Sequence, residues 1–215
     1  HGLLRRQRQM CIRDSLSYLK PHLSCPIYID TDVNAAALAE LQWGAGRGLE
    51  SLVYVTVGTG VGGGYARMGR THHGLLHPEM GHMRVPRLEW DSFPGVCPFH
   101  GDCIEGLCSG PAIEARCGQS AETLPDDHPE WERLGKYLGS FAANILLTLS
   151  PEKIVFGGGV MQSGDLLPRV RKYTVQSLNG YLQHPMISSG AKEIISAPAL
   201  KGESVSYTHL TLPTK

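Results

Sequence analysis

Four cysteine and histidine residues between positions 82 and 103 constrain this chain more than any other feature of its sequence. His82 is followed by Cys97, His100 and Cys103, and the last three stand in the order Cys-x-x-His-x-x-Cys. Thiolate and imidazole side chains at such spacing are the ligands that tetrahedral zinc requires. Four protein ligands leave no position for water, so the sequence predicts a structural zinc site; unlinked loop residues are the alternative.

Charge and cysteine content narrow the class of protein further. The chain has 215 residues, with 20 basic and 20 acidic side chains. This balance argues against binding nucleic acid by neutralising its phosphates. No apolar run reaches the length of a membrane span or forms a signal-peptide core. Six cysteines placed unevenly in such a chain favour a reducing, cytoplasmic compartment and a metal site over a disulfide framework.

Strand and helix patterns alternate along the chain, which predicts an α/β architecture. The termini, residues 1–15 and 205–215, follow neither pattern and resemble read-through from sequencing adaptors, with flexible termini as the alternative. We therefore expect one domain over residues 16–204. Strands are expected over 26–29, 52–57, 154–156 and 193–196, helices over 33–43, 110–117, 130–149 and 165–183, and a loop-rich region over 69–108.

An acidic motif, residues 30–37, stands where the first strand meets the first helix. A carboxylate there lies at the carboxyl edge of the sheet, where open α/β sheets bind ligands. Asp32 can then act as general base toward a substrate hydroxyl. The competing interpretation is that Thr31 or Asp32 only caps the helix.

Two glycine stretches follow strands, at residues 58–64 and 157–159. In the first, backbone N–H groups and the Thr59 hydroxyl can cradle a phosphate, although a tight hairpin explains the same pattern. It fits neither the Walker nor the Rossmann motif. The second stretch lets an adenine ring lie against the backbone, and a plain strand-to-helix turn competes with that interpretation.

Glu79 stands three residues before His82, in the sequence His-Pro-Glu-Met-Gly-His. A loop anchored by zinc would hold this carboxylate rigidly, and a fixed carboxylate accepts hydrogen bonds from sugar hydroxyls. On its own, a glutamate in such a loop is more often a solvated charge. We expect Glu79 and Asp32 to face one shared cleft.

The order of these motifs resembles that of the bacterial ROK (repressor, ORF, kinase) family, and within it the fructokinases. The motifs are Asp-Thr-Asp-Val-Asn-Ala-Ala at 30–36, Gly-Thr-Gly-Val-Gly-Gly-Gly at 58–64, His-Pro-Glu-Met-Gly-His at 77–82, Cys-Pro-Phe-His-Gly-Asp-Cys-Ile-Glu-Gly at 97–106 and Phe-Gly-Gly-Gly-Val at 156–160. The resemblance covers residues 16–204. It implies an actin-like ATPase (ribonuclease H-like) fold, of which this chain holds mostly the C-terminal half, with a zinc-binding loop.

The resemblance also assigns roles to residues. It implies that Asp32 is the catalytic base for the sugar 6-hydroxyl and that ATP with magnesium is the phosphoryl donor. The sugar-binding residues would be Thr31, Asn34, Glu79 and His82, the nucleotide-binding residues Gly58, Thr59, Gly60, Gly157, Gly158 and Gly159, and the zinc ligands His82, Cys97, His100 and Cys103. A homodimer that binds neither membrane nor nucleic acid is the expected assembly.

Two departures from the family pattern shape the expected function. Thr31 stands where family glucokinases carry asparagine, which favours fructose as the sugar over glucose, mannose or an N-acetylhexosamine. The family's N-terminal Asp-x-Gly-Gly-Thr phosphate loop does not occur, so we expect this chain alone not to hold ATP properly. A sugar-sensing repressor of the same family and a zinc hydrolase are the alternatives. The presence of Asp32 and of both glycine loops argues against a repressor. The four protein ligands argue against a hydrolase, because they leave the zinc no open position for a water.

Overall fold

The structure is a computed structural model that describes residues 17–24, 27 and 29–201. The chain divides into two compact units, residues 1–31 and 32–215. In the first unit, residues 17–19 are helical, and the His22 N–H donates to the Leu19 carbonyl at 3.0 Å. Of the strand predicted over 26–29, positions 26 and 28 lie outside the described residues, and Ile27 and Ile29 are not in a strand.

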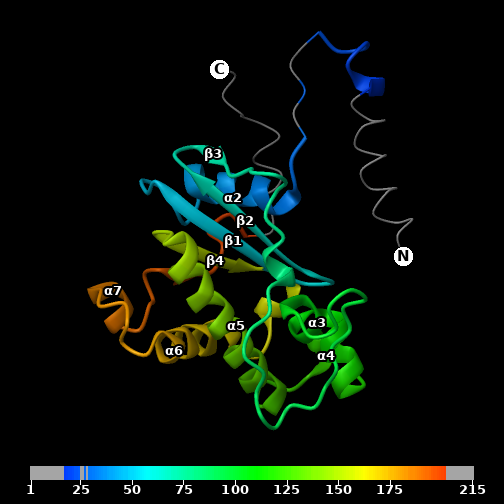
Figure 1. Ribbon diagram of the computed structural model, residues 1–215, viewed down its shortest axis with the longest axis vertical. Coiled ribbons are helices and arrows are strands. Elements are labelled where there is room, and N and C mark those ends of the chain that lie inside the picture. The colour runs from blue at the N-terminus through cyan, green and yellow to red at the C-terminus, as the bar shows by residue number, and fades with distance from the viewer. Residues whose placement is uncertain (1–16, 25–26, 28, 202–215) are drawn as a thin grey trace. The chain divides into compact units, whose positions relative to one another are not determined.

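A five-stranded mixed sheet, in the order β3-β2-β1-β4-β5, forms the centre of the second unit (Figure 1). The strands are β1 Ser51–Val57, β2 Val61–Arg67, β3 Arg70–Thr71, β4 Lys153–Gly157 and β5 Ile195–Ser196. Strand β1 runs parallel to β4, and β4 parallel to β5, whereas β1 and β2 form an antiparallel hairpin. The glycine stretch at 58–64 is thus a hairpin turn that continues into a strand.

Alternating side chains of β1 pack against helices on the two faces of the sheet, as the two-residue period of a strand requires. Val53, Val55 and Val57 belong to the core on the side of α5 (Pro129–Leu149). Leu52 and Tyr54 belong to a second core on the side of α2 (Asp32–Trp43). Helix α2 therefore covers one face of the sheet, and α5 covers the other (Figure 1).

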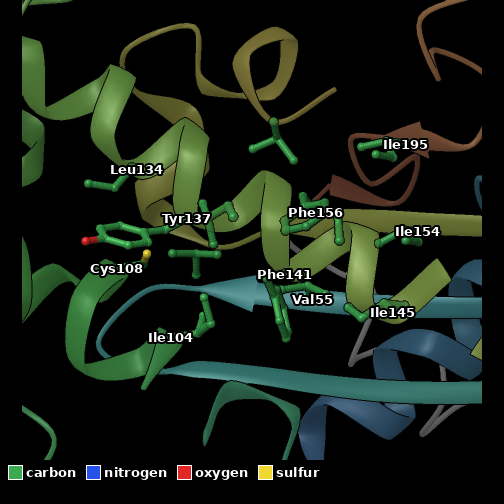
Figure 2. Close-up of a cluster of buried hydrophobic side chains, with 14 of the residues drawn as sticks. Val55, Ile104, Cys108, Leu134, Tyr137, Phe141, Ile145, Ile154, Phe156 and Ile195 are labelled. Carbon is green, nitrogen blue, oxygen red and sulfur yellow. The ribbon is translucent and has the colours of Figure 1, made fainter. Parts of the chain in front are cut away.

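Helix α5 contributes more residues to the larger core than any other element, with Leu134, Tyr137, Phe141 and Ile145 at helical spacing (Figure 2). It begins at Pro129, which suits a first helical turn because its missing N–H has no partner there. The neighbouring α6 (Leu166–Leu178) packs alongside it. The predicted helix over 165–183 ends early because Asn179 and Gly180 adopt left-handed backbone, with φ of 45° and 75°.

The remaining elements are short. They are η1 Met80–His82, α3 Ile104–Cys108, α4 Gly110–Cys117, η2 Ala121–Thr123, η3 Gly159–Gln162 and α7 Pro185–Ser188. The predicted loop-rich region 69–108 is thus mostly irregular, with β3, η1 and α3 inside it. Within the part of the chain that the structure describes, no helix combines the length and the apolar character needed to cross a bilayer.

Candidate functional site

A cavity of about 640 Å³ lies at the carboxyl ends of β1 and β4. Its volume is within the range of pockets that bind small molecules. Five parts of the chain contribute its walls: the first turns of α2, the parallel strands β1 and β4, the segment around η3 and the segment after β5. The lining residues are Asp32, Val33, Ala36, Tyr54, Thr56, Phe156, Gly157, Gly158, Gly159, Met161, Gln162, Ala197, Pro198 and Lys201.

Asp32 is the first residue of α2, and its exposed side chain lines this cavity. Its Oδ1 accepts a hydrogen bond from the Val33 N–H at 2.9 Å. A capping side chain reaches N–H groups two or three residues further on, so this bond to the next residue is not an N-cap bond. The structure therefore places the predicted base at a ligand-sized cavity.

The three glycines after β4 line the same cavity, and two of them have a packing reason to be glycine. A Cβ on Gly157 would overlap the Tyr54 hydroxyl, and a Cβ on Gly158, at φ 95°, would overlap the Val57 carbonyl. Gly159 has open space around its missing side chain. Packing therefore does not explain why residue 159 is glycine. A glycine without a packing reason is expected where a ligand approaches the backbone.

The other predicted residues of the acidic motif are placed differently. Thr31 belongs to the first unit, and its N–H donates locally to Asp30 Oδ1 at 2.7 Å. Asn34 is fully buried in α2 and is not among the residues that line the cavity. Their predicted roles in sugar binding stay predictions.

Strand β2 separates the start of α2 from η1. A Cβ on Gly62 would lie 3.1 Å from Val33, whereas a Cβ on Gly63 would lie 2.8 Å from the sulfur of Met80. Since successive residues of a strand face opposite sides, α2 and η1 contact opposite faces of β2. Strand β3 pairs with β2 only at Ala66 and Arg67, so the first residues of β2 form an edge of the described sheet.

Glu79 directly precedes η1 and therefore lies on the other face of β2 from Asp32. Its carboxylate is largely exposed and bonds His77 Nε2 at 3.0 Å. The cavity that Asp32 lines does not include Glu79 or the turn residues Gly58, Thr59 and Gly60 among its described walls. The shared cleft predicted for the two carboxylates is thus not one enclosed cavity, because the helix that carries Asp32 and the 3-10 helix that follows Glu79 contact opposite faces of β2.

The four predicted metal ligands converge on one point. The ligand atoms of His82, Cys97, His100 and Cys103 all lie within 4.8 Å of one another. Cys97 Sγ lies 3.7 Å from Nδ1 of both histidines, and Cys103 Sγ lies 3.6 Å from His82 Nδ1. Tetrahedral zinc with ordinary bond lengths holds sulfur and nitrogen ligands about 3.6 Å apart. The cluster therefore fits a small divalent metal.

The protonation state of the Cys103 thiol in the cluster depends on whether a cation is bound. Burial raises the pKa of the Cys103 thiol to about 11, with a further increase from neighbouring Cys97. Without a metal this side chain is a neutral thiol at physiological pH, whereas a bound divalent ion stabilises the thiolate.

Elements flanking the metal cluster hold the turn of the β1–β2 hairpin. The Ile104 N–H donates to the Met83 carbonyl at 2.9 Å, which joins the start of α3 to the end of η1. From α3, Glu105 Oε2 accepts the Val61 N–H at 3.2 Å. From the start of α4, the Gly110 N–H donates to the Gly58 carbonyl at 2.7 Å. Glu105 thus takes one N–H of the turn that was predicted to cradle phosphate.

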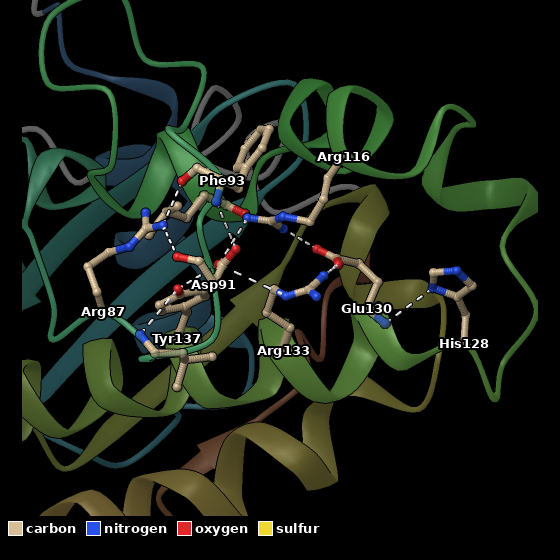
Figure 3. Close-up of polar contacts among 10 residues, drawn as sticks. Arg87, Asp91, Phe93, Arg116, His128, Glu130, Arg133 and Tyr137 are labelled. Carbon is tan, nitrogen blue, oxygen red and sulfur yellow. Dashed lines mark hydrogen bonds and ion pairs between the residues drawn. The ribbon is translucent and has the colours of Figure 1, made fainter.

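A buried polar network anchors the segment between His82 and Cys97 to α4 and α5 (Figure 3). Asp91 accepts hydrogen bonds from the Tyr137 hydroxyl at 2.7 Å and the Phe93 N–H at 3.2 Å. Arg116 and Arg133 both pair with the fully buried Glu130, and both also approach Asp91. This network fixes the loop from which the metal ligands project.

Sequence reasoning missed several cavity residues. Tyr54 and Thr56 were predicted to lie in or at the end of a strand and were given no role at the site. They face the same side of the sheet, opposite to Val55, and this is the side on which Asp32 lies. The alternation of the strand could therefore have identified them as cavity residues. Met161, Gln162, Pro198 and Lys201 carry no motif, and only the fold brings them to the cavity.

Comparison with known proteins shows what the whole chain is similar to. A family model described as ROK family matches residues 12–205. The chain is 42% identical over 184 residues to the fructokinase of Lactococcus lactis, covering 85% of this chain and 61% of that protein. It is 43% identical over 190 residues to the fructokinase of Zymomonas mobilis, covering 87% and 62% respectively. The chain thus spans less than two thirds of the length of these two relatives.

The crystal structure of the ROK hexokinase from Thermus thermophilus superposes with a TM-score of 0.70 at 25% identity, covering 85% of this chain and 63% of that one. This similarity confirms the predicted α/β fold of the actin-like ATPase type.

Proposed function

Because this chain belongs to the ROK family, we propose that its protein phosphorylates the 6-hydroxyl of a hexose with ATP, and that fructose is the preferred sugar. One observation carries the proposal: Asp32 and the Gly157–Gly159 stretch line a single cavity at the carboxyl ends of two parallel strands. A general base and a backbone surface open to a nucleotide are the two groups that phosphoryl transfer to an alcohol needs side by side.

In this proposal Asp32 accepts the proton of the sugar hydroxyl as the hydroxyl oxygen attacks the terminal phosphorus atom of ATP. The bond between that phosphorus and its bridging oxygen breaks, and ADP leaves. The adenosine lies against Gly159, where packing leaves the backbone exposed. The magnesium that accompanies ATP would neutralise phosphate charge, and the protein contributes mainly positioning.

The sugar is proposed to bind beside Asp32 at the mouth of this cavity, with Glu79 as a second contact from the other face of β2. The exposed Glu79 carboxylate accepts hydrogen bonds from sugar hydroxyls, and His82, three residues later, anchors its loop. Thr31 and Asn34 are retained as proposed sugar contacts, and Gly58, Thr59 and Gly60 as a proposed phosphate-binding turn.

The metal at the four-ligand cluster is proposed to be a structural zinc. All four ligands come from the protein, so no position remains for a reactive water. Its proposed role is to hold η1 and α3 around the hairpin turn, through the contacts of Ile104, Glu105 and Gly110.

Preference for fructose is supported by two relatives whose names are fructokinase and by Thr31. Glucose, mannose and N-acetylhexosamines are the competing substrates. A homodimer in the cytoplasm completes the proposal, and light scattering coupled to gel filtration tests the dimer.

The function is tested by measuring ADP production with ATP and a panel of hexoses. The chain is assayed alone and fused to the portion of the Lactococcus lactis fructokinase that it does not match. We expect the fusion to turn over fructose with the highest kcat/KM. A fusion that binds hexoses but forms no ADP with any of them would contradict the kinase and favour a sugar sensor.

A further inference from the structure

Glu40 is a carboxylate buried in α2 whose hydrogen bonds reach distant parts of the chain. Its side chain is fully buried. Oε2 accepts the N–H of Ala45 at 2.8 Å and of Ala199 at 3.1 Å, and Oε1 accepts the N–H of Leu200 at 3.0 Å. Hydrogen bonds to an ionised acceptor are roughly twice as strong as those between neutral groups. Glu40 therefore ties α2 firmly to the segment that follows β5.

Both structures joined by Glu40 are walls of the cavity. Asp32, Ala36 and Glu40 are spaced four residues apart and so lie along one side of α2. The first two line the cavity, and Glu40 stands one turn further from it. On the other wall, Ala197, Pro198 and Lys201 line the cavity, and the two residues between them are those that Glu40 holds.

Pro198 shows how the position of this segment affects the site. A Cβ on Gly157 would lie 3.0 Å from Cγ of Pro198, so the proline ring packs directly over the glycine stretch. A shift of segment 197–201 away from α2 would widen the cavity at Gly157. Such a shift would also change the distance between this wall and the helix that carries Asp32.

We propose that Glu40 is a positioning residue for nucleotide binding: by holding Ala199 and Leu200 it sets the width of the cavity between α2 and segment 197–201. This inference rests on the proposed function, because it takes the cavity to be the ATP site. Glu40 does not line the cavity and contacts no substrate, so its effect passes entirely through the segment that it holds.

The test compares Glu40→Gln with Glu152→Gln. The glutamine keeps the shape of the side chain but places an amide donor against backbone donors. Glu152 is the control for a carboxylate that binds backbone amides, because its Oε2 accepts the N–H groups of Glu50 at 2.7 Å and Ser51 at 2.9 Å, although its side chain is exposed where that of Glu40 is buried. That clamp lies at the opposite end of β1, away from the cavity. Both variants therefore lose a carboxylate that binds two or more backbone amides.

Two readouts separate positioning from general loss of stability. Hydrogen exchange of the amides of Ala199 and Leu200 is measured on the chain, and the dissociation constant of MgATP on the fusion. We expect Glu40→Gln to accelerate exchange at both amides and to raise the ATP dissociation constant about tenfold, with the KM for fructose unchanged. Glu152→Gln should change neither readout. Glu40→Asp, which keeps the charge on a shorter side chain, should give a smaller increase in the ATP dissociation constant and serves if the glutamine variant does not fold.

The outcomes are distinguishable. A wild-type fusion that binds no ATP would overturn the proposed function and this inference with it. A wild type that binds ATP, with Glu40→Gln and Glu40→Asp binding it equally well, would overturn this inference alone. An equal loss of ATP affinity in Glu152→Gln would also overturn it, because the effect would then follow stability and not the position of segment 197–201.

Discussion

Asp32 begins the helix that packs on one face of β2, and Glu79 directly precedes the 3-10 helix that packs on the opposite face. The glycines of β2 make this possible, because Gly62 admits Val33 on one side and Gly63 admits Met80 on the other. The segments that carry the two carboxylates consequently lie on opposite faces of one strand.

Asp32→Asn should separate catalysis from binding. The amide cannot accept the proton of the sugar hydroxyl, so kcat should fall about 10³-fold while the dissociation constant for fructose changes little. Turnover and calorimetric sugar binding are measured on the fusion, with exposed Asp126→Asn as the charge control. Substantial turnover in Asp32→Asn, or in Asp32→Ala, would remove Asp32 from its proposed role.

The metal cluster should hold about one zinc per chain. Cys103→Ser should abolish binding of the metal and lower the melting temperature, because η1 and α3 lose their link. Cys117→Ser is the matched control, since this half-buried thiol lies outside the cluster. Elemental analysis and thermal unfolding check the prediction, and a fully folded chain without metal would refute the structural role.

Much of the fold was predictable because the signals were local. The β-branched run of β1 and the helical spacing in α5 determined both elements, and the Cys-x-x-His-x-x-Cys spacing identified three of the four converging ligands. Strand β2 was harder to predict, because glycine disfavours strand structure. For that reason the hairpin was only the alternative interpretation of this glycine stretch. The glycines of β2 lack side chains, which leaves room for α2 on one face of the strand and η1 on the other.

The cavity could be predicted only in part. Asp32 and Gly157–Gly159 follow strands, and the carboxyl ends of parallel strands meet at one edge of a sheet. Glu40 gave no such signal, because its partners Ala199 and Leu200 lie 159 and 160 residues away along the chain. Because Ala199 and Leu200 bind Glu40 through backbone amides, their side chains carry no sequence signal of the contact.

Asp91 should make the chain less stable in acid. Burial alone would raise its pKa, but hydrogen bonds from Tyr137 and the Phe93 N–H, together with Arg116 and Arg133, hold the pKa of Asp91 below its usual value of 3.8. A lowered pKa in the folded state means that the stabilisation is present above the unfolded pKa and is lost as pH falls through the folded one. The contribution of Asp91 to the free energy of unfolding should therefore decrease as the pH falls below about 4.

Asp91→Asn isolates this contribution. At neutral pH the variant should lose roughly 3 kcal/mol, because Arg116 and Arg133 keep only Glu130 as an acidic partner. Its free energy of unfolding should also fall less than that of the wild type when pH is lowered from about 5 to about 3. Urea unfolding of both proteins gives the difference, and parallel pH profiles would contradict the assignment.

Gly64 should be the least replaceable glycine of β2. A Cβ there would overlap the Val33 carbonyl and lie 2.6 Å from the Asn34 nitrogen, both of which are backbone atoms of the first turn of α2. Gly64→Ala must therefore displace this turn, which should cost about 1–3 kcal/mol of unfolding free energy. It should also lower kcat, because Asp32 begins the same turn.

Gly74→Ala is the matched substitution, since Gly74 has open space around it and no left-handed backbone. Its unfolding free energy should stay within about 0.5 kcal/mol of wild type. If Gly64→Ala kept wild-type stability and turnover, α2 would not rest on β2 in the way that places Asp32 at the cavity.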